Sequence, residues 1–149
     1  MKITKSKDFK SPNISVFLGG TTSSNWRQSL IKILNENVNY FDPVVDNWDD
    51  VAYNRELIAR KNCDFVLYVL SPCAIGQYST AELIDDSNKR PEKTLCCLLI
   101  DDFDTNGDPH EWSAFELKSM KNVFRLAKKN GANVFHHFGD IAIFLNHNK

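Results

Sequence analysis

The sequence predicts an α/β fold in which a five-stranded parallel sheet carries helices on both faces. Short runs of apolar, β-branched and aromatic residues alternate with longer segments whose apolar residues recur at helical spacing. Two of the short runs, residues 65–70 and 94–100, show no polar alternation. Uninterrupted runs of this kind are typical of strands that are buried on both faces, as in a parallel sheet.

The size and charge of the chain limit the classes of function it can have. Its 149 residues, 42% hydrophobic and 25% charged, fit one soluble domain over residues 1–149, with residues 1–12 as a loose lead-in. The net charge of −1 predicts no nucleic-acid partner. Because no apolar run could span a bilayer and the N-terminus lacks a signal-peptide core, we expect a cytoplasmic protein with no membrane partner.

The first predicted strand, residues 14–18, runs into a loop of small residues, Gly19-Gly20-Thr21-Thr22-Ser23-Ser24-Asn25, before a helix over residues 26–35. Glycines let the backbone approach a ligand closely, and the hydroxyl groups could reach a sugar or a phosphate. The loop matches neither the dinucleotide-binding nor the P-loop motif. A plain turn and a ligand cradle therefore both remain open.

The second predicted strand, residues 38–41, leads into an acidic loop, residues 44–50, that contains Asp46 and Trp48. Acidic residues ahead of a helix usually cap it. Alternatively, they could bind ribose hydroxyls while the Trp48 ring stacks on a base. The helix over residues 51–62 follows, with Val51, Leu57 and Ile58 as core candidates.

The central predicted strand, residues 65–70, is followed by a loop and a helix that starts near Thr80 and contains Glu82. Ser79 and Glu82 have capping-box spacing, so Glu82 could simply cap the helix. Alternatively, a carboxylate in the first helical turn, kept ionised by the helix dipole, could attack or stabilise a sugar cation. The spacing alone does not choose between these interpretations.

The last third of the chain completes the alternation of strands and helices. We predict a strand at 94–100, a turn-rich acidic loop at 101–109, a helix at 111–129, a strand at 133–138 and a closing helix at 140–146. The four cysteines lack metal-ligand spacing, and we expect buried free thiols, with Cys96 and Cys97 on opposite faces of their strand.

Five strands that alternate with helices predict a flavodoxin-like three-layer sandwich with strand order 2-1-3-4-5. Ligands bind such sheets at the carboxyl ends of the strands. We therefore expect one rim to gather the Gly19-Gly20 loop, the neighbourhood of Asp64 and residues 76–82. The expected core includes Val16, Leu18, Val66, Tyr68, Leu98 and Leu99.

Four stretches resemble the nucleoside 2-deoxyribosyltransferase-like proteins, in the same order along the chain. They are VFLGGT at 16–21, YFDPVV at 40–45, CDFVLY at 63–68 and YSTAE at 78–82. The resemblance implies a flavodoxin-like fold and cleavage of the N-glycosidic bond of a (deoxy)nucleoside or nucleotide, with transfer to another base or to water. It also implies a homodimer or higher homo-oligomer. Carboxylate attack and loss of a base need no cofactor or metal.

The resemblance also implies roles for particular residues. Glu82 matches the nucleophile that attacks the anomeric carbon, and Glu56, within Asn54-Arg55-Glu56-Leu57, matches a carboxylate that contacts the substrate. Asp64 matches the aspartate that opens the central strand. The expected substrate-binding residues are Gly19, Gly20, Thr21, Asp46, Trp48, Asp64, Tyr78 and Ser79.

A second, shorter resemblance leaves another function open. Val69-Leu-Ser-Pro72, followed by Glu82-Leu83, is similar to the region of TIR domains in which some members carry a catalytic glutamate for NAD cleavage. Many TIR domains act only in signalling interactions. The alternatives are therefore an NAD-cleaving domain and a non-catalytic nucleotide-binding or interaction module.

Overall fold

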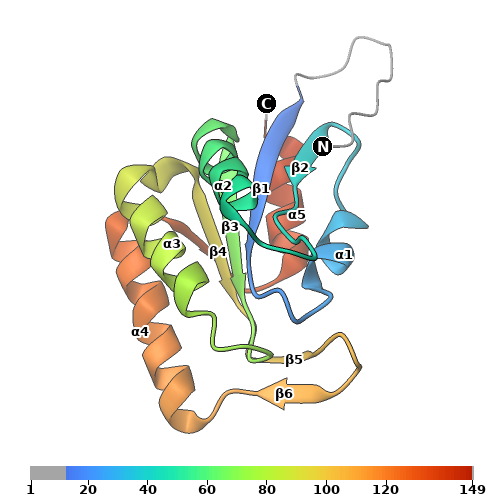
Figure 1. The fold of residues 1–149 in the computed structure, drawn as a ribbon. Coiled ribbons are helices and arrows are strands. Elements are labelled where there is room, and N and C mark those ends of the chain that lie inside the picture. Colours follow the sequence, from blue (N-terminus) through green and yellow to red (C-terminus); the bar gives the residue numbers. More distant parts are fainter. Residues whose placement is uncertain (1–12, 149) are drawn as a thin grey trace.

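The computed structural model describes residues 13–148, in which a five-stranded parallel sheet lies between two layers of helices (Figure 1). The predicted lead-in, residues 1–12, lies outside the described residues. The strand order is β2-β1-β3-β4-β7, which confirms the predicted order because β7 is the fifth strand of this sheet. Its strands are β1 (Ile14–Gly20), β2 (Val38–Phe41), β3 (Phe65–Leu70), β4 (Thr94–Leu98) and β7 (Asn133–Phe135).

Helices cover both faces of the sheet, as predicted. One layer contains α2 (Asp50–Asn62), α3 (Gln77–Lys89) and α4 (Ala114–Asn130), and the other contains α1 (Trp26–Ile31) and α5 (Phe138–His147). A short 3₁₀ helix, η1 (Pro91–Lys93), joins α3 to β4. Helix α1 is shorter than the predicted 26–35. The turn after it is linked to α5, because Asn35 N–H donates to the Asn146 side chain at 2.8 Å.

Alternate residues of the central strands point into two separate cores. Val16, Leu18 and Leu67 pack against α1 and α5, whereas Val66 and Tyr68 pack against α2, α3 and α4. Burial of Val16, Leu18, Val66 and Tyr68 is therefore confirmed. Leu98 and Leu99 are only partly buried, because β4 ends at Leu98 and these side chains lie where the sheet stops. Cys96 and Cys97 are buried free thiols in opposite cores, as predicted.

A second, two-stranded sheet lies beyond the carboxyl ends of the main strands. The segment predicted to be an acidic loop pairs β5 (Asp101–Phe103) antiparallel to β6 (Pro109–Glu111) (Figure 1). The hairpin is fastened to the main sheet at Asp102, whose carboxylate accepts hydrogen bonds from the hydroxyls of Ser24 at 2.5 Å and Ser71 at 2.6 Å. Helix α4 consequently starts at Ala114, after a capping box between Ser113 and Glu116, and not at residue 111.

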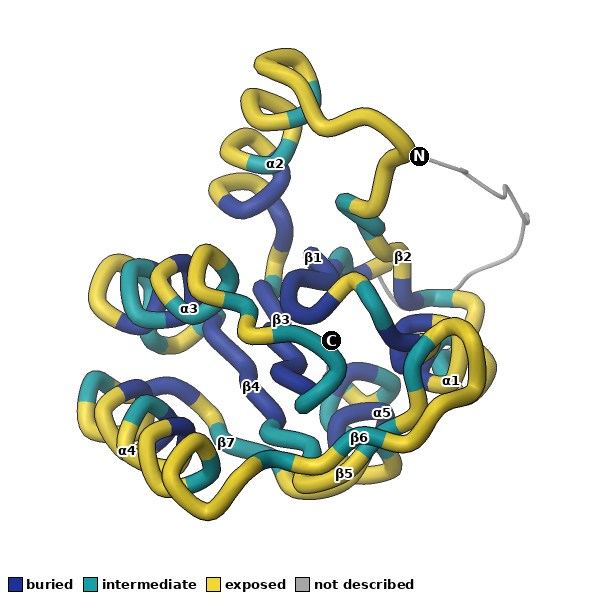
Figure 2. Tube along the Cα trace, turned by 60° about the horizontal axis from the view of Figure 1, so that its bottom comes forward, coloured by how far each residue is buried: buried dark blue, intermediate teal, exposed yellow. Residues whose placement is uncertain are grey.

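Helix α2 projects from the body of the molecule and is exposed along most of its length (Figure 2). The prediction that Val51, Leu57 and Ile58 belong to the core is wrong, because these side chains are 58%, 39% and 60% exposed. The buried residues of this helix are Ala59 and Arg60, close to its C-terminal end.

Residues 13–148 contain no helix with the length and apolar character needed to cross a membrane.

Gly20 offers a test of the backbone at the end of β1. Its φ is +115°, and a Cβ atom would lie 2.0 Å from the carbonyl oxygen of Val69. We expect Gly20→Ala to lower the free energy of unfolding by about 2 kcal/mol or more, from left-handed strain and this clash. Chemical denaturation measures the loss.

Gly139→Ala is the matched control, because a Cβ there would meet no atom within 4 Å. It should change stability by no more than about 1 kcal/mol. Equal stability of the two variants would contradict the backbone described at Gly20.

Candidate active site

A pocket of about 400 Å³ lies at the carboxyl ends of β1 and β3. This volume falls within the range of about 300–1,000 Å³ that is usual for small-molecule sites. Its walls are the loop after β1, the segment between β2 and α2, and the start of α3. The lining residues are Gly19, Gly20, Thr22, Arg27, Pro43, Val44, Val45, Trp48, Glu56, Tyr78, Ser79 and Glu82.

The backbone of Gly19 and Gly20 forms one wall because there is no room for side chains. A Cβ on Gly19 would lie 2.6 Å from the ring of Tyr68, and one on Gly20 would strike the backbone of Val69. The loop is held to β3 where Thr21 N–H donates to the Val69 carbonyl at 3.0 Å. A ligand in the pocket can therefore approach main-chain atoms directly.

Arg27 supports this loop from within the protein. Its side chain is 2% exposed and donates to the carbonyls of Leu18 at 3.0 Å, Gly20 at 3.3 Å and Thr21 at 2.8 Å. Asp42 lies 3.4 Å from its Nε. Burial lowers the pKa of Arg27 to about 10, although Asp42 opposes this shift, so the guanidinium remains charged at neutral pH. Arg27 therefore stabilises the loop mainly through its hydrogen bonds to these backbone carbonyls.

Two aromatic rings and a carboxylate form the opposite side of the pocket. The Trp48 and Tyr78 rings lie with centroids 6.2 Å apart and planes at 64°. The Trp48 indole N–H donates to the Glu56 carboxylate. This bond fixes the ring against the middle of α2 and leaves both aromatic side chains about half exposed at the mouth of the pocket.

Glu82 is not a capping residue. Helix α3 begins at Gln77, and its N-cap is Gly76 in the left-handed conformation, with φ of +61°. Ser79 therefore lies inside the helix and Glu82 in its second turn, so the capping box that their spacing allowed does not form. The predicted helix start near Thr80, with Glu82 in the first turn, is wrong. The earlier start is stabilised by Thr80, whose N–H and hydroxyl both donate to the Gly76 carbonyl at 2.9 Å.

The Glu82 carboxylate is buried and incompletely paired. The residue is 5% exposed, and Oε2 lies 3.4 Å from Nη1 of Arg60. No hydrogen-bond donor among residues 13–148 reaches Oε2. Burial raises the pKa of Glu82 from 4.5 to about 7, a shift that Arg60 opposes and Glu56 increases. The expectation that the helix dipole keeps this group fully ionised is therefore wrong, and near neutral pH both forms are populated.

Seven of the predicted site residues line the pocket together, whereas three do not. Thr21 is buried in the packing, where its hydroxyl accepts from Ser71 N–H at 2.9 Å. Asp46 is exposed and outside the lining set. Asp64 precedes β3 and therefore lies at the opposite end of the sheet, where it accepts from Ser15 N–H at 2.7 Å. The expectation of one rim that includes Asp64 is wrong.

Five lining residues and the charged group beside Glu82 were not predicted from the sequence. Thr22, Arg27, Pro43, Val44 and Val45 line the pocket. Pro43-Val44-Val45 belongs to one of the four stretches that resemble the family, which is a signal that could have drawn attention to it. In the sequence, Arg60 is one of several polar residues of a predicted helix, and nothing distinguishes it from the exposed ones. In residues 13–148, no group of three or more His, Cys, Asp or Glu side chains is arranged to hold a metal ion.

The raised pKa of Glu82 predicts an effect on stability. As pH rises from about 4.5 to about 7, the unfolded chain releases this proton first, so the free energy of unfolding falls. The amide introduced by Glu82→Gln cannot titrate, and Arg60 keeps its pairs with Asp85 and Asp86. We therefore expect Glu82→Gln to gain about 3 kcal/mol of stability relative to the parent as pH rises from about 5 to about 8.

Urea denaturation of both proteins across this pH range measures the difference. A constant difference between the two proteins would mean that Glu82 titrates normally.

Comparison with known proteins supplies the family. The model of the family described as nucleoside 2-deoxyribosyltransferase like matches residues 13–98. This segment contains β1 to β4 and every residue that lines the pocket. No curated protein matches the chain. Because the family model covers more than half of the chain, the protein belongs to the nucleoside 2-deoxyribosyltransferase-like family, as the sequence resemblance predicted, and this family suggests glycosyl transfer on nucleosides.

Proposed function

We propose that this protein cleaves the N-glycosidic bond of a (deoxy)nucleoside or nucleotide, with Glu82 as the nucleophile. The observation that carries the proposal is the buried Glu82 carboxylate in the pocket, whose Oε2 lacks a hydrogen-bond donor among the described residues. A carboxylate that is not saturated by donors retains lone pairs for an incoming electrophile. A carboxylate with a pKa of about 7 is also ionised often enough to attack at neutral pH.

The reaction consists of two displacements at the anomeric carbon. First, a Glu82 oxygen bonds to this carbon while its bond to the base nitrogen breaks, and the base leaves with the electron pair and takes up a proton. Then water or a second base attacks the same carbon, loses a proton and releases the Glu82 carboxylate. These steps use a carboxylate and the departure of a base, so the proposal requires no cofactor.

The other lining residues orient the substrate. Glu56, held by the Trp48 indole, can accept a hydrogen bond from a sugar hydroxyl. The half-exposed Trp48 and Tyr78 rings offer faces on which a base can stack. The glycine backbone leaves space for the sugar to approach Glu82 and Ser79.

Glu82→Gln tests the proposed chemistry. The change keeps the size of the side chain but removes the attacking charge, so we expect release of free base to fall by about a thousandfold or more. In the parent, kcat/KM should rise about tenfold per pH unit below pH 7 and level off above it, as Glu82 ionises. The assay resolves bases released from deoxynucleosides, their monophosphates and NAD.

Glu92→Gln is the control, since Glu92 is exposed in η1 outside the pocket and should leave turnover unchanged. Full activity of Glu82→Gln would remove the nucleophile from the proposal. Release of nicotinamide from NAD alone would favour the TIR-like function, and no turnover of any compound would favour a binding module.

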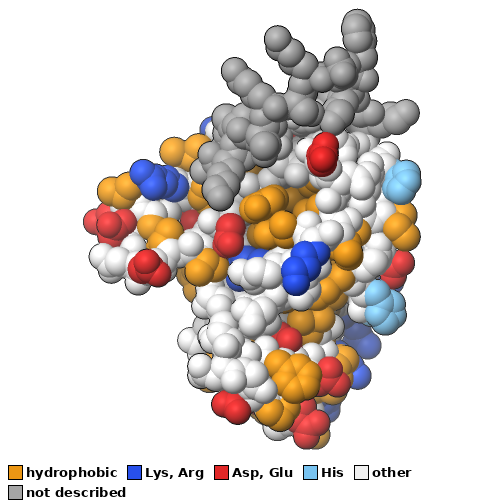
Figure 3. Space-filling view, turned by 90° about the vertical axis from the view of Figure 1, so that its right-hand side faces the viewer, with side chains coloured by type: hydrophobic (Ala, Val, Ile, Leu, Met, Phe, Trp, Pro, Cys, Tyr) orange, Lys and Arg blue, Asp and Glu red, His pale blue; other side chains and the backbone are white. Residues whose placement is uncertain are grey.

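We also propose that the protein forms a homodimer or larger homo-oligomer through the projecting lobe of α2 and the segment before it. Apolar side chains lie at the surface of this lobe (Figure 3). Val51, Leu57 and Ile58 on the helix, and Val44 and Val45 before it, are each between 39% and 60% exposed. Because Val44 and Val45 also line the pocket, a partner on this surface would lie against its mouth.

Light scattering tests this assembly. We expect the parent to be oligomeric, and Ile58→Glu to dissociate it, because a charge buried in an apolar interface costs several kcal/mol. Ile143→Glu is the matched control, since Ile143 on α5 has the same 60% exposure but lies on the other layer. A monomeric parent, or equal effects of the two variants, would contradict the proposed surface.

A further inference from the structure

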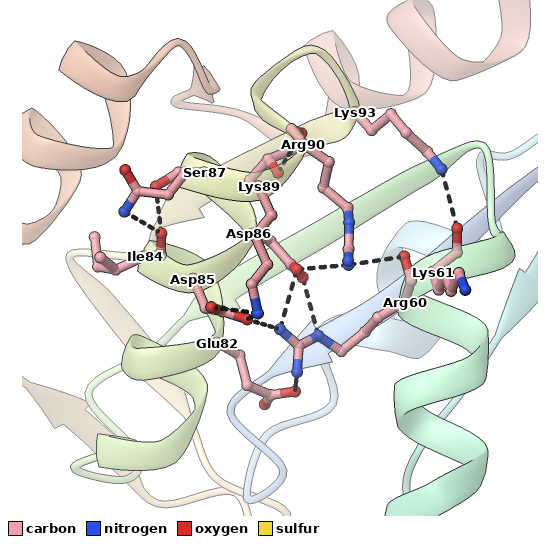
Figure 4. Close-up of polar contacts among 12 residues, drawn as sticks. Arg60, Lys61, Glu82, Ile84, Asp85, Asp86, Ser87, Lys89, Arg90 and Lys93 are labelled. Carbon is pink, nitrogen blue, oxygen red and sulfur yellow. Dashed lines mark hydrogen bonds and ion pairs between the residues drawn. The ribbon is translucent and has the colours of Figure 1, made fainter.

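Arg60 lies buried between α2 and α3 and joins Glu82 to a cluster of charges (Figure 4). Its Nε and Nη2 form a two-point contact with the Asp86 carboxylate, each at 3.0 Å. Nη2 also donates to Asp85 at 3.1 Å. One edge of the guanidinium is therefore fixed by two aspartates of α3.

Asp86 holds this edge firmly because its own hydrogen-bonding capacity is fully used. The carboxylate is completely buried and accepts from Arg60 twice, from Arg90 Nη1 at 2.7 Å and from the Tyr68 hydroxyl at 2.5 Å. Four donors match the roughly four lone-pair positions of a carboxylate. Rotation of Arg60 would break several of these contacts together.

The remaining nitrogen, Nη1, points towards Glu82. It lies 3.4 Å from Glu82 Oε2, close enough for an ion pair but without the geometry of a hydrogen bond. Hydrogen bonds in catalytic sites are often long before substrate binds and shorten in the complex. The guanidinium is thus held in place by Asp86 while one N–H group remains available to Glu82.

We infer that Arg60 is a positioning residue that sets the charge state of Glu82 and holds its carboxylate towards the pocket, acting from the neighbouring helix. Its effect on catalysis rests on the proposed function, whereas its effect on the ionisation of Glu82 does not. Arg60 does not line the pocket and does not itself act on the substrate.

The charges around Glu82 predict the direction in which its pKa should change in each variant. Arg60 stabilises the ionised form, whereas Glu56 from α2 and Asp85 and Asp86 from α3 oppose it. Tyr78 and Arg27 also line the pocket, and Tyr68 on β3 is a core residue whose ring lies against Gly19. Loss of the Arg60 cation should therefore raise the pKa of Glu82, and loss of the Asp85 charge should lower it. A purely structural tie between the helices predicts no such opposite effects.

The experiment measures Glu82 without any substrate. In each background, the difference in unfolding free energy between the protein and its Glu82→Gln counterpart is followed against pH. The slope of this difference falls to zero as Glu82 ionises in the folded protein, and the midpoint of that fall reports the Glu82 pKa. The backgrounds are the parent, Arg60→Gln, Asp85→Asn and Arg90→Gln. Arg90 is the matched control because it also contacts Asp86, with no ion pair to Glu82 among the described residues.

We expect the midpoint to rise by about one unit or more in Arg60→Gln, to fall in Asp85→Asn and to change least in Arg90→Gln. An unchanged midpoint in Arg60→Gln, or equal shifts in the Arg60 and Arg90 variants, would overturn the inference. If Arg60→Gln does not fold, Asp85→Asn decides, because Asp85 is partly exposed and its loss should be tolerated. A fall in its midpoint supports the inference, and no fall overturns it.

A second measurement keeps this inference separate from the proposed function. If the protein releases base, the pH dependence of kcat/KM should move in the same direction as the midpoint in each variant. If the midpoints shift as expected but no compound is turned over, the proposed function fails while the role of Arg60 stands. If turnover is found but its pH dependence does not shift with the midpoints among the variants, Arg60 does not act on catalysis through Glu82.

Discussion

The architecture around the pocket depends on the buried carboxylate of Asp86. It connects α2 through Arg60, β3 through Tyr68 and the end of α3 through Arg90. Helix α2 buries little else, so this ion cluster is its principal attachment to the body. Removing one partner from such a buried cluster typically costs about 3–5 kcal/mol, since it leaves an uncompensated charge. Because Arg60 belongs to α2, the cluster also fixes Glu56 in the middle of α2, and Trp48 just before the helix, relative to Glu82 on α3.

Glu82 contrasts with Asp86 although the two are one helical turn apart. Asp86 accepts from four donors, whereas Glu82 Oε2 accepts from none among the described residues. A buried oxygen without a donor opposes folding. The fold tolerates this because the rest of α3 is well packed through Leu83 and Asp86. Local instability of this kind is expected where a group must remain available to a ligand.

The sequence predicts the main sheet well because two of its inner strands, β3 and β4, are uninterrupted apolar runs, and the alternation of strands and helices favours order 2-1-3-4-5. It does not predict β5 and β6, which have three residues each and are largely polar, so their pairing depends on Ser24 and Ser71 anchoring Asp102. The exposure of Leu57 and Ile58 is equally unpredictable, because apolar residues at helical spacing normally face a core.

The residues of the candidate pocket likewise differ in how well the sequence predicts them. Glycines at a strand end and a glutamate after the next strand can be recognised from their positions, since parallel strands place their carboxyl ends together. Arg60 and Asp86 cannot, because each occupies a helix position where a charge usually meets solvent, and 26 residues separate them. Only the parallel packing of β1, β3 and β4 brings α2 and α3 side by side and buries both charges. The residues that would react are thus visible in the sequence, whereas those that control their ionisation emerge only from the folded arrangement of the two helices.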